Sequence, residues 1–93
     1  MNGMPTDGTE ELLRVRGVHT RMVTVCQRHR VALLEVLGMS RSASVVKARG
    51  HAAYELRKLG FSWPEVGELL GRHQATVHSA ADSHAKRAGL EKL

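Results

Sequence analysis

The stretch FSWPEVGELLGRHQATVHSAA, residues 61–81, holds two short amphipathic patterns separated by a glycine. Ser62 followed three residues later by Glu65 is the pattern of a capping box, in which the hydroxyl accepts from a first-turn amide and the carboxylate reaches back. The first helix is therefore predicted to begin at Ser62 or Trp63. It is expected to end at Leu70, because Gly71 permits the positive φ of a sharp chain reversal.

The second half of the stretch predicts a helix with one buried side. Val77, His84 and Ala88 recur at helical spacing, with Ala80 or Ala81 between them. The remaining surface carries mostly small or hydrogen-bonding residues: Gln74, Ala75, Thr76, His78, Ser79 and Asp82. Two helices joined by a glycine turn, spanning about residues 62–88, predict a helix-turn-helix. Double-stranded DNA is then the leading expected partner.

Composition limits what the rest of the chain can be. Its 93 residues suffice for one compact domain, and the net charge of +5 favours an anionic partner, either a phosphate backbone or a membrane surface. No apolar run approaches the roughly 20 residues that span a bilayer, and the polar start lacks the core of a signal peptide. We expect a cytoplasmic protein without a membrane partner. The single cysteine, Cys26, excludes an intramolecular disulfide and is expected in the core.

The remaining segments predict an all-α fold without strands. Residues 1–8 are expected to be a disordered lead-in, and residues 9–93 a single helical DNA-binding domain. A helix from Thr9 should be interrupted near Gly17, an amphipathic helix should follow over residues 19–30, and a short apolar piece should end at Gly38.

A long basic helix is predicted over residues 45–59, capped by Ser44 and stopped by Gly60. Its expected buried stripe is Val45, Ala48, Ala52, Leu56 and Leu59. Its expected outward face is Lys47, Arg49, His51, Arg57 and Lys58.

The order of these features resembles a known family, the C-terminal DNA-binding domain of the bacterial replication initiator DnaA. The resemblance covers about residues 22–88: a basic loop with Arg41, the helix KARGHAAYELRKL, then SWPEVGELLG, close to the family's S-L-P-E-I-G. RHQATVHSA stands where the family signature reads G-R-D-H-[ST]-T-V-x-H-A. The family's ATPase loop, G-x-x-x-x-G-K-[ST], does not occur in the 93 residues, so the chain is not expected to be an ATP-switched initiator by itself.

This chain departs from the family at the start of the second helix. His73, Gln74 and Ala75 replace the family's Asp, His and Ser or Thr, so a different DNA sequence is expected to be read. Gly50 also replaces a Gln that commonly follows the arginine, which removes a side chain able to touch the DNA backbone.

The resemblance and the residue chemistry together predict two groups of DNA contacts. The residues expected to meet base edges are His73, Gln74, Ala75, Thr76 and Ser79 in the major groove and Arg41 in the adjacent minor groove. Those expected to hold phosphates are Lys47, Arg49 and Arg72.

Other readings of the same residues remain open. Arg49, Arg57 and Lys58 would equally suit a merely solvated helix face, and Trp63, His78 and His84 are expected to be packing or surface residues. The alternatives at the level of function are an unrelated helix-turn-helix transcription regulator and a protein-interaction adaptor.

Catalysis and metal binding have little support. No nucleophile, base and orienting group can be placed together, so no enzyme activity and no cofactor are expected. Cys26 and His29 share a C-x-x-H spacing, but a structural zinc site needs four convergent ligands, so no metal is expected. Replication or transcription proteins are possible partners, while the target sequence and the oligomeric state stay open.

Overall fold

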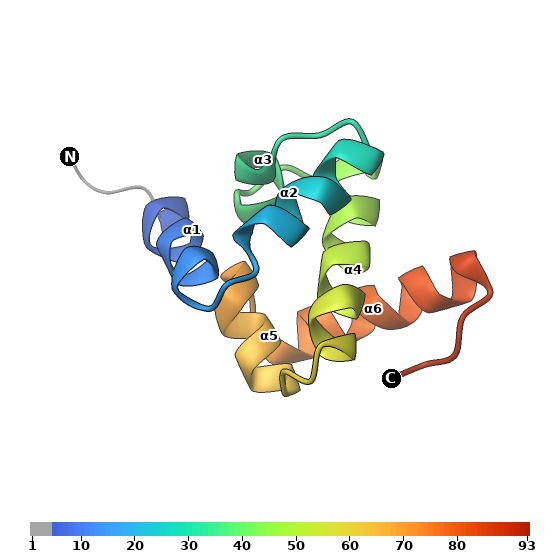
Figure 1. The fold of residues 1–93 in the computed structure, drawn as a ribbon. Coiled ribbons are helices and arrows are strands. Elements are labelled where there is room, and N and C mark those ends of the chain that lie inside the picture. The colour runs from blue at the N-terminus through green and yellow to red at the C-terminus, as the bar shows by residue number, and fades with distance from the viewer. Residues whose placement is uncertain (1–4) are drawn as a thin grey trace.

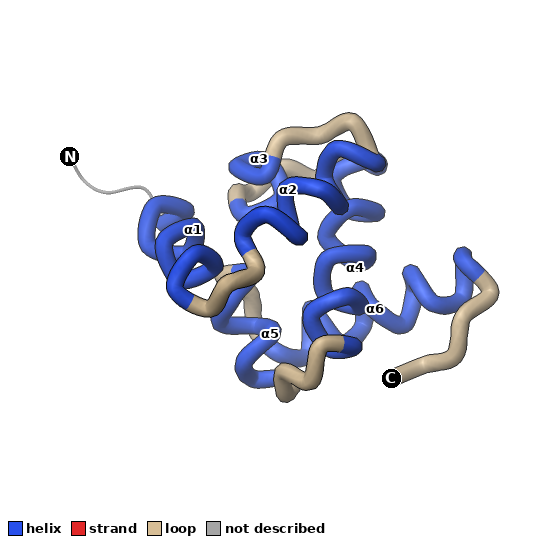
Figure 2. Tube along the Cα trace, viewed as in Figure 1, coloured by secondary structure: helices blue, strands red, loops and turns tan. Residues whose placement is uncertain are grey.

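The computed structural model describes residues 5–93, and within them the chain forms six helices and no strand. These are α1 (Pro5–Val15), α2 (His19–Arg28), α3 (Leu33–Leu37), α4 (Ala43–Lys58), α5 (Trp63–Leu70) and α6 (Gln74–Ala88). The predicted all-α class is confirmed, and Figure 2 shows how short the loops between the helices are. None of these helices is both long and apolar enough to cross a bilayer.

Helix α4 lies at the centre of the fold. It contacts α2 and α3 on one side and α5 and α6 on the other, and α6 crosses it (Figure 1). Helix α1 packs against α5, α2 and α3 at the edge of the molecule. After α6 the chain folds back, and the Tyr54 hydroxyl donates to the Glu91 carbonyl at 2.9 Å.

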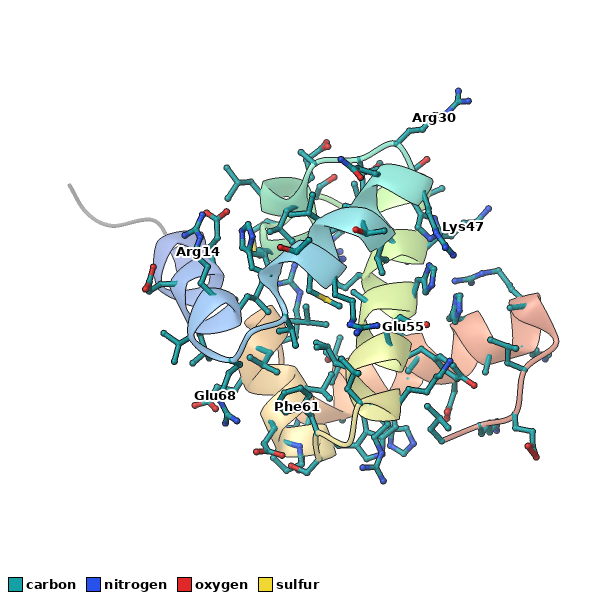
Figure 3. All side chains as sticks on the ribbon, in the orientation of Figure 1. Arg14, Arg30, Lys47, Glu55, Phe61 and Glu68 are labelled. Atoms are coloured by element: carbon teal, nitrogen blue, oxygen red, sulfur yellow. The ribbon has the colours of Figure 1, made fainter. Side chains whose placement is uncertain are left out.

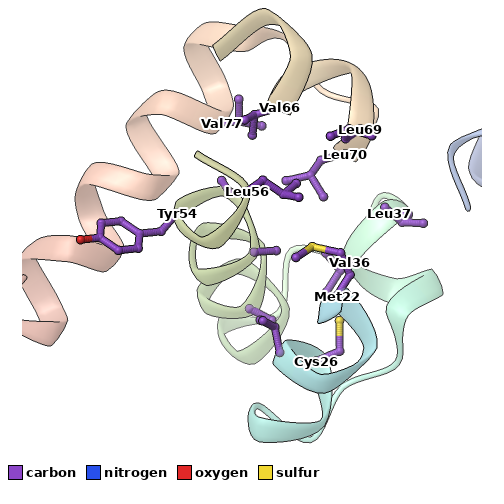
Figure 4. Close-up of a cluster of buried hydrophobic side chains, with 14 of the residues drawn as sticks. Met22, Cys26, Val36, Leu37, Tyr54, Leu56, Val66, Leu69, Leu70 and Val77 are labelled. Carbon is purple, nitrogen blue, oxygen red and sulfur yellow. The ribbon is translucent and has the colours of Figure 1, made fainter. Parts of the chain in front are cut away.

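One hydrophobic core joins all six helices. Met22 and Cys26 from α2 lie beside Val36 from α3, and Leu70 from α5 reaches toward Leu56 from α4 (Figure 4). The two N-terminal helices therefore complete the core. The core position expected for Cys26 is confirmed, and burial raises the pKa of its thiol to about 11, with a smaller contribution from Glu35.

Two predicted helix starts are corrected. Helix α1 begins at Pro5, so residues 5–8 belong to a helix and not to a disordered lead-in; the rest of that predicted segment, residues 1–4, lies outside the described residues. Helix α4 begins at Ala43 and is capped by Ser42, whose hydroxyl accepts from the Val45 amide at 3.4 Å, and not by Ser44. Both serines carry the same capping group, so composition alone does not rank them.

Most of the predicted stripe on α4 is confirmed. Val45, Ala48, Ala52 and Leu56 are buried, whereas Leu59 is 44% exposed. Leu59 is the C-cap residue, one position beyond the last residue of α4. Ala88, the last residue of α6, is likewise exposed.

Candidate nucleic-acid interface

The predicted helix-turn-helix is formed by α5 and α6. The Ser62 hydroxyl accepts from the Glu65 amide at 3.3 Å, and the Glu65 carboxylate accepts from the Ser62 amide at 2.8 Å, which confirms the capping box. Gly71 has φ 66° and ends α5 in the left-handed conformation, as predicted. Helix α6 then begins at Gln74, with the His73 imidazole accepting from the Ala75 amide at 3.1 Å.

The five residues predicted to meet base edges in the major groove lie together on one surface, at the start of α6. His73, Gln74, Ala75, Thr76 and Ser79 are all exposed over the first two turns of α6. Val77, which follows Thr76, is fully buried and fixes the rotation of the helix about its axis. The polar side of α6 consequently faces solvent.

A hollow beside this helix start brings several predicted residues together. It is lined by Met39, Ser40, Arg41, Arg49, Gly71, Arg72, His73 and Thr76. Three segments that are distant in sequence thus meet here: the loop before α4, one turn of α4 and the start of α6. Arg41 itself is exposed on that loop.

Arg49 does not project outward as predicted. Its side chain is 8% exposed, and its guanidinium donates to backbone carbonyls of α3 and of the following loop. Nε lies 2.9 Å from the Val36 oxygen, and Nη2 lies 3.2 to 3.4 Å from the carbonyl oxygens of Ser40, Gly38 and Glu35. The interpretation of Arg49 as a solvated, outward-facing side chain is therefore wrong: its Nε and Nη2 atoms donate within the fold, whereas its predicted phosphate contact stays a prediction.

Arg72 reaches the same loop from the turn between α5 and α6. Its guanidinium donates to the carbonyls of Leu37 at 3.4 Å, Gly71 at 3.2 Å and, more closely, Gly38. Its side chain is partly exposed. Burial lowers the pKa of Arg49 and of Arg72, and the charge of Arg72 lowers that of Arg49 further.

Lys47 lies away from this hollow. It is exposed and points outward on the same side of the molecule as Arg30 (Figure 3). Burial, then Arg87 and then Lys47 lower the pKa of His29, which places Lys47 in the neighbourhood of that histidine.

That neighbourhood contains a histidine cluster, formed by His29 at the C-cap of α2, His51 on α4 and His84 on α6. The His29 Nε2 and His51 Nδ1 atoms are 3.0 Å apart, and the rings of His51 and His84 stack with centroids 4.5 Å apart. Glu55 lies 3.8 Å from His51. His84 also contacts the Tyr54 ring, so the packing role expected for it is confirmed.

Two packing contacts hold α6 against the neighbouring helices, and the sequence predicted the partners in neither of them. Gly50 packs so closely on α6 that a Cβ placed there would lie 2.6 Å from the Ala80 carbonyl oxygen. The Trp63 ring stacks on His78 with centroids 4.3 Å apart, while the Arg57 guanidinium lies 5.4 Å from the same ring. Trp63 is thus a packing residue, as expected, and it joins the first turn of α5 to α6. Its partners lie on other helices, so the local sequence around Trp63 does not predict them.

Comparisons with known proteins agree with this geometry. The family described as "Bacterial dnaA protein helix-turn-helix" matches residues 22–83, from α2 to the middle of α6. The chain is 43% identical over 60 residues to the "Chromosomal replication initiator protein DnaA" of Thermomicrobium roseum. That match covers 62% of this chain and 13% of the initiator. No solved structure matches. With two thirds of its residues inside the family match and the α5–α6 motif in place, the chain belongs to the bacterial DnaA helix-turn-helix family of DNA-binding domains.

Proposed function

We propose that α6 enters the major groove of double-stranded DNA while Arg41 reaches into the adjacent minor groove. The observation that carries the proposal is the hollow where Arg41 and the exposed start of α6 meet. An α-helix fits the major groove, and in helix-turn-helix proteins the N-terminal residues of the second helix meet the base edges.

The residues at the start of α6 would read a mixed sequence. Gln74 suits adenine, because its amide can bond both N6 and N7, while Ala75 or the Thr76 methyl can pack on a thymine methyl. His73 can approach a guanine acceptor, and Ser79 can bond either a donor or an acceptor one turn further along. These side chains differ from the family signature, so we expect a target that differs from the family's usual site.

Phosphate contacts would hold the domain in place on the DNA, with α6 in the major groove and Arg41 in the minor groove. Lys47 is exposed and free to approach one strand, and the partly exposed Arg72 stands beside the start of α6. A narrow A·T-rich minor groove has an enhanced negative potential, which attracts the guanidinium of Arg41.

A role in the control of replication or transcription follows as part of the proposal. The family membership favours this role over an unrelated helix-turn-helix regulator. If the protein binds no duplex DNA, the alternative function is that of an adaptor that binds only proteins.

The test is duplex binding with matched glutamine variants. Gln74→Ala should weaken binding about ten- to a hundredfold, the loss typical of one bidentate base contact. Gln27→Ala, at an exposed position on α2, is the control and should bind like the wild type. Wild-type affinity should also fall steeply between low and physiological salt, because each neutralised phosphate releases counterions. Equal affinities of the two variants, or binding that is insensitive to salt, would overturn the proposal.

A further inference from the structure

Two arginines hold the Gly38–Ser40 part of the loop that carries Arg41, and the rest of the loop leads into the Ser42 cap of α4. The loop follows α3, whose last carbonyls have no partner within the helix, as at any helix end. Arg49 and Arg72 supply those partners, and both donate to the Gly38 carbonyl. The conformation of the loop thus depends on one side chain from α4 and one from the α5–α6 turn.

Neither guanidinium is paired with an acid. Among the side chains of residues 8–93, every ion pair of 4.0 Å or less involves groups other than Arg49 and Arg72. Their positive charges therefore remain uncompensated beside His73 and Arg41. Arg49 is almost wholly buried, and its Nε and Nη2 atoms donate to four backbone carbonyls.

We propose that Arg49 and Arg72 are positioning residues, which fix the loop so that Arg41 stands at a set distance from the first turn of α6. This inference rests on the proposed function, in which Arg41 and α6 occupy neighbouring grooves at the same time. Arg49 acts through Arg41 and touches no DNA itself, whereas Arg72 also holds a phosphate in the proposed complex.

The chemistry of the anchor distinguishes positioning from a general effect of charge. A guanidinium presents five donors in a rigid planar fork and can serve several carbonyls at once, whereas an ammonium is a point charge with three donors. Arg49→Lys consequently keeps the charge and loses the fork. If only the positive field near α6 mattered, lysine would restore binding.

A double-mutant cycle between Arg49 and Arg41 tests the inference. The probe is a duplex enriched by the wild-type protein from a random pool, at one fixed salt concentration. Arg41→Ala alone is expected to weaken binding on the order of tenfold, the loss typical of one charged contact. Arg49→Lys should weaken it by a similar factor, and the double variant should bind no more weakly than Arg41→Ala. Arg21→Lys, at an exposed site on α2, is the control and should match the wild type.

Two results would overturn positioning: wild-type affinity of Arg49→Lys, or losses that multiply in the double variant. Thermal unfolding of each variant shows whether it is folded at the binding temperature. If Arg49→Lys is unfolded, the same cycle with the more exposed Arg72→Lys decides the matter by the same criteria, because lysine keeps a positive charge for the phosphate contact of Arg72. Failure of the proposed function is distinguishable, because the wild type would then bind no duplex in a salt-dependent way, whereas multiplying losses overturn the positioning role alone.

Discussion

At the scale of single residues, Arg41 and Arg49 show how the same side chain acquires different roles. Arg41 is exposed on a loop, while Arg49, eight residues later, is buried under the carbonyls of α3. Helical spacing predicts an outward direction for Arg49, because it treats α4 as an isolated cylinder. Arg49 is buried because it contacts the end of α3, and this contact joins two separate helices.

Gly50 gives a prediction at the same scale. A Cβ at this position would lie 2.6 Å from the Ala80 carbonyl oxygen, a backbone atom that moves only with α6. Gly50→Ala should therefore lower the free energy of unfolding by about 1 to 3 kcal/mol, the usual cost of overpacking. Denaturant unfolding monitored by circular dichroism measures it.

Gly8→Ala is the matched control for Gly50→Ala. Gly8 also lies inside a helix, but a Cβ there meets nothing within 4 Å. The control should be unchanged or more stable by roughly 0.5 to 1 kcal/mol, since alanine favours helices. If the two alanine variants were equally stable, the close α4–α6 crossing would be contradicted.

At the scale of elements, the helix-turn-helix is the part that the sequence predicts best. The Ser62–Glu65 capping box and the Gly71 turn are local patterns, in which the partners lie within a few residues of one another. The crossing of α4 by α6 joins residues about 30 positions apart and has no local pattern. For that reason the exposed side of α6 was predicted correctly, whereas the packing role of Gly50 was missed.

The histidine cluster links α2, α4 and α6 and gives a dependence of stability on pH. Burial lowers the pKa of His29, His51 and His84 below the usual 6.5, and nearby positive charges add to this effect. The charged and titratable groups around the cluster are Arg28, Lys47, Glu55 and Arg87. Below pH 6.5 the unfolded chain binds more protons at these histidines than the folded chain does. The contribution of the uncharged histidines to folding stability is therefore complete above that pH, and it is lost as the pH falls toward the folded pKa values.

We expect the melting temperature of the wild type to be lower at pH 5.5 than at pH 7.5. His51→Gln removes the central ring of the cluster and should reduce this difference, while His73→Gln, outside the cluster, should retain it. Thermal unfolding of the three proteins at both pH values provides the measurement. A wild-type melting temperature that stays constant or rises on acidification would contradict the packing of the uncharged rings.

At the scale of the whole molecule, the N-terminal helices extend the domain beyond the family match. The match begins at residue 22, yet Leu13 and Val18 belong to the same core as Val36 and Leu70. Their buried side chains show that these helices complete the core.

The distribution of positive charge also becomes clear only at this scale. Arg41, Arg49 and Arg72 gather at one end of α6, and Lys47 and Arg87 lie near the histidine cluster. Composition gives the sum of +5 but not its division between two surfaces. The hollow with three arginines is the surface that the proposed DNA complex uses.

In vitro selection of duplexes from a random pool, with the wild type and with Arg41→Ala in parallel, tests the central claim most directly. We predict that the wild type enriches one motif, a mixed core flanked on one side by an A·T-rich step. Arg41→Ala should keep the core, read by the start of α6, and lose the flanking preference. No enriched motif with the wild type, or an identical full motif with both proteins, would contradict the placement of α6 and Arg41 in neighbouring grooves.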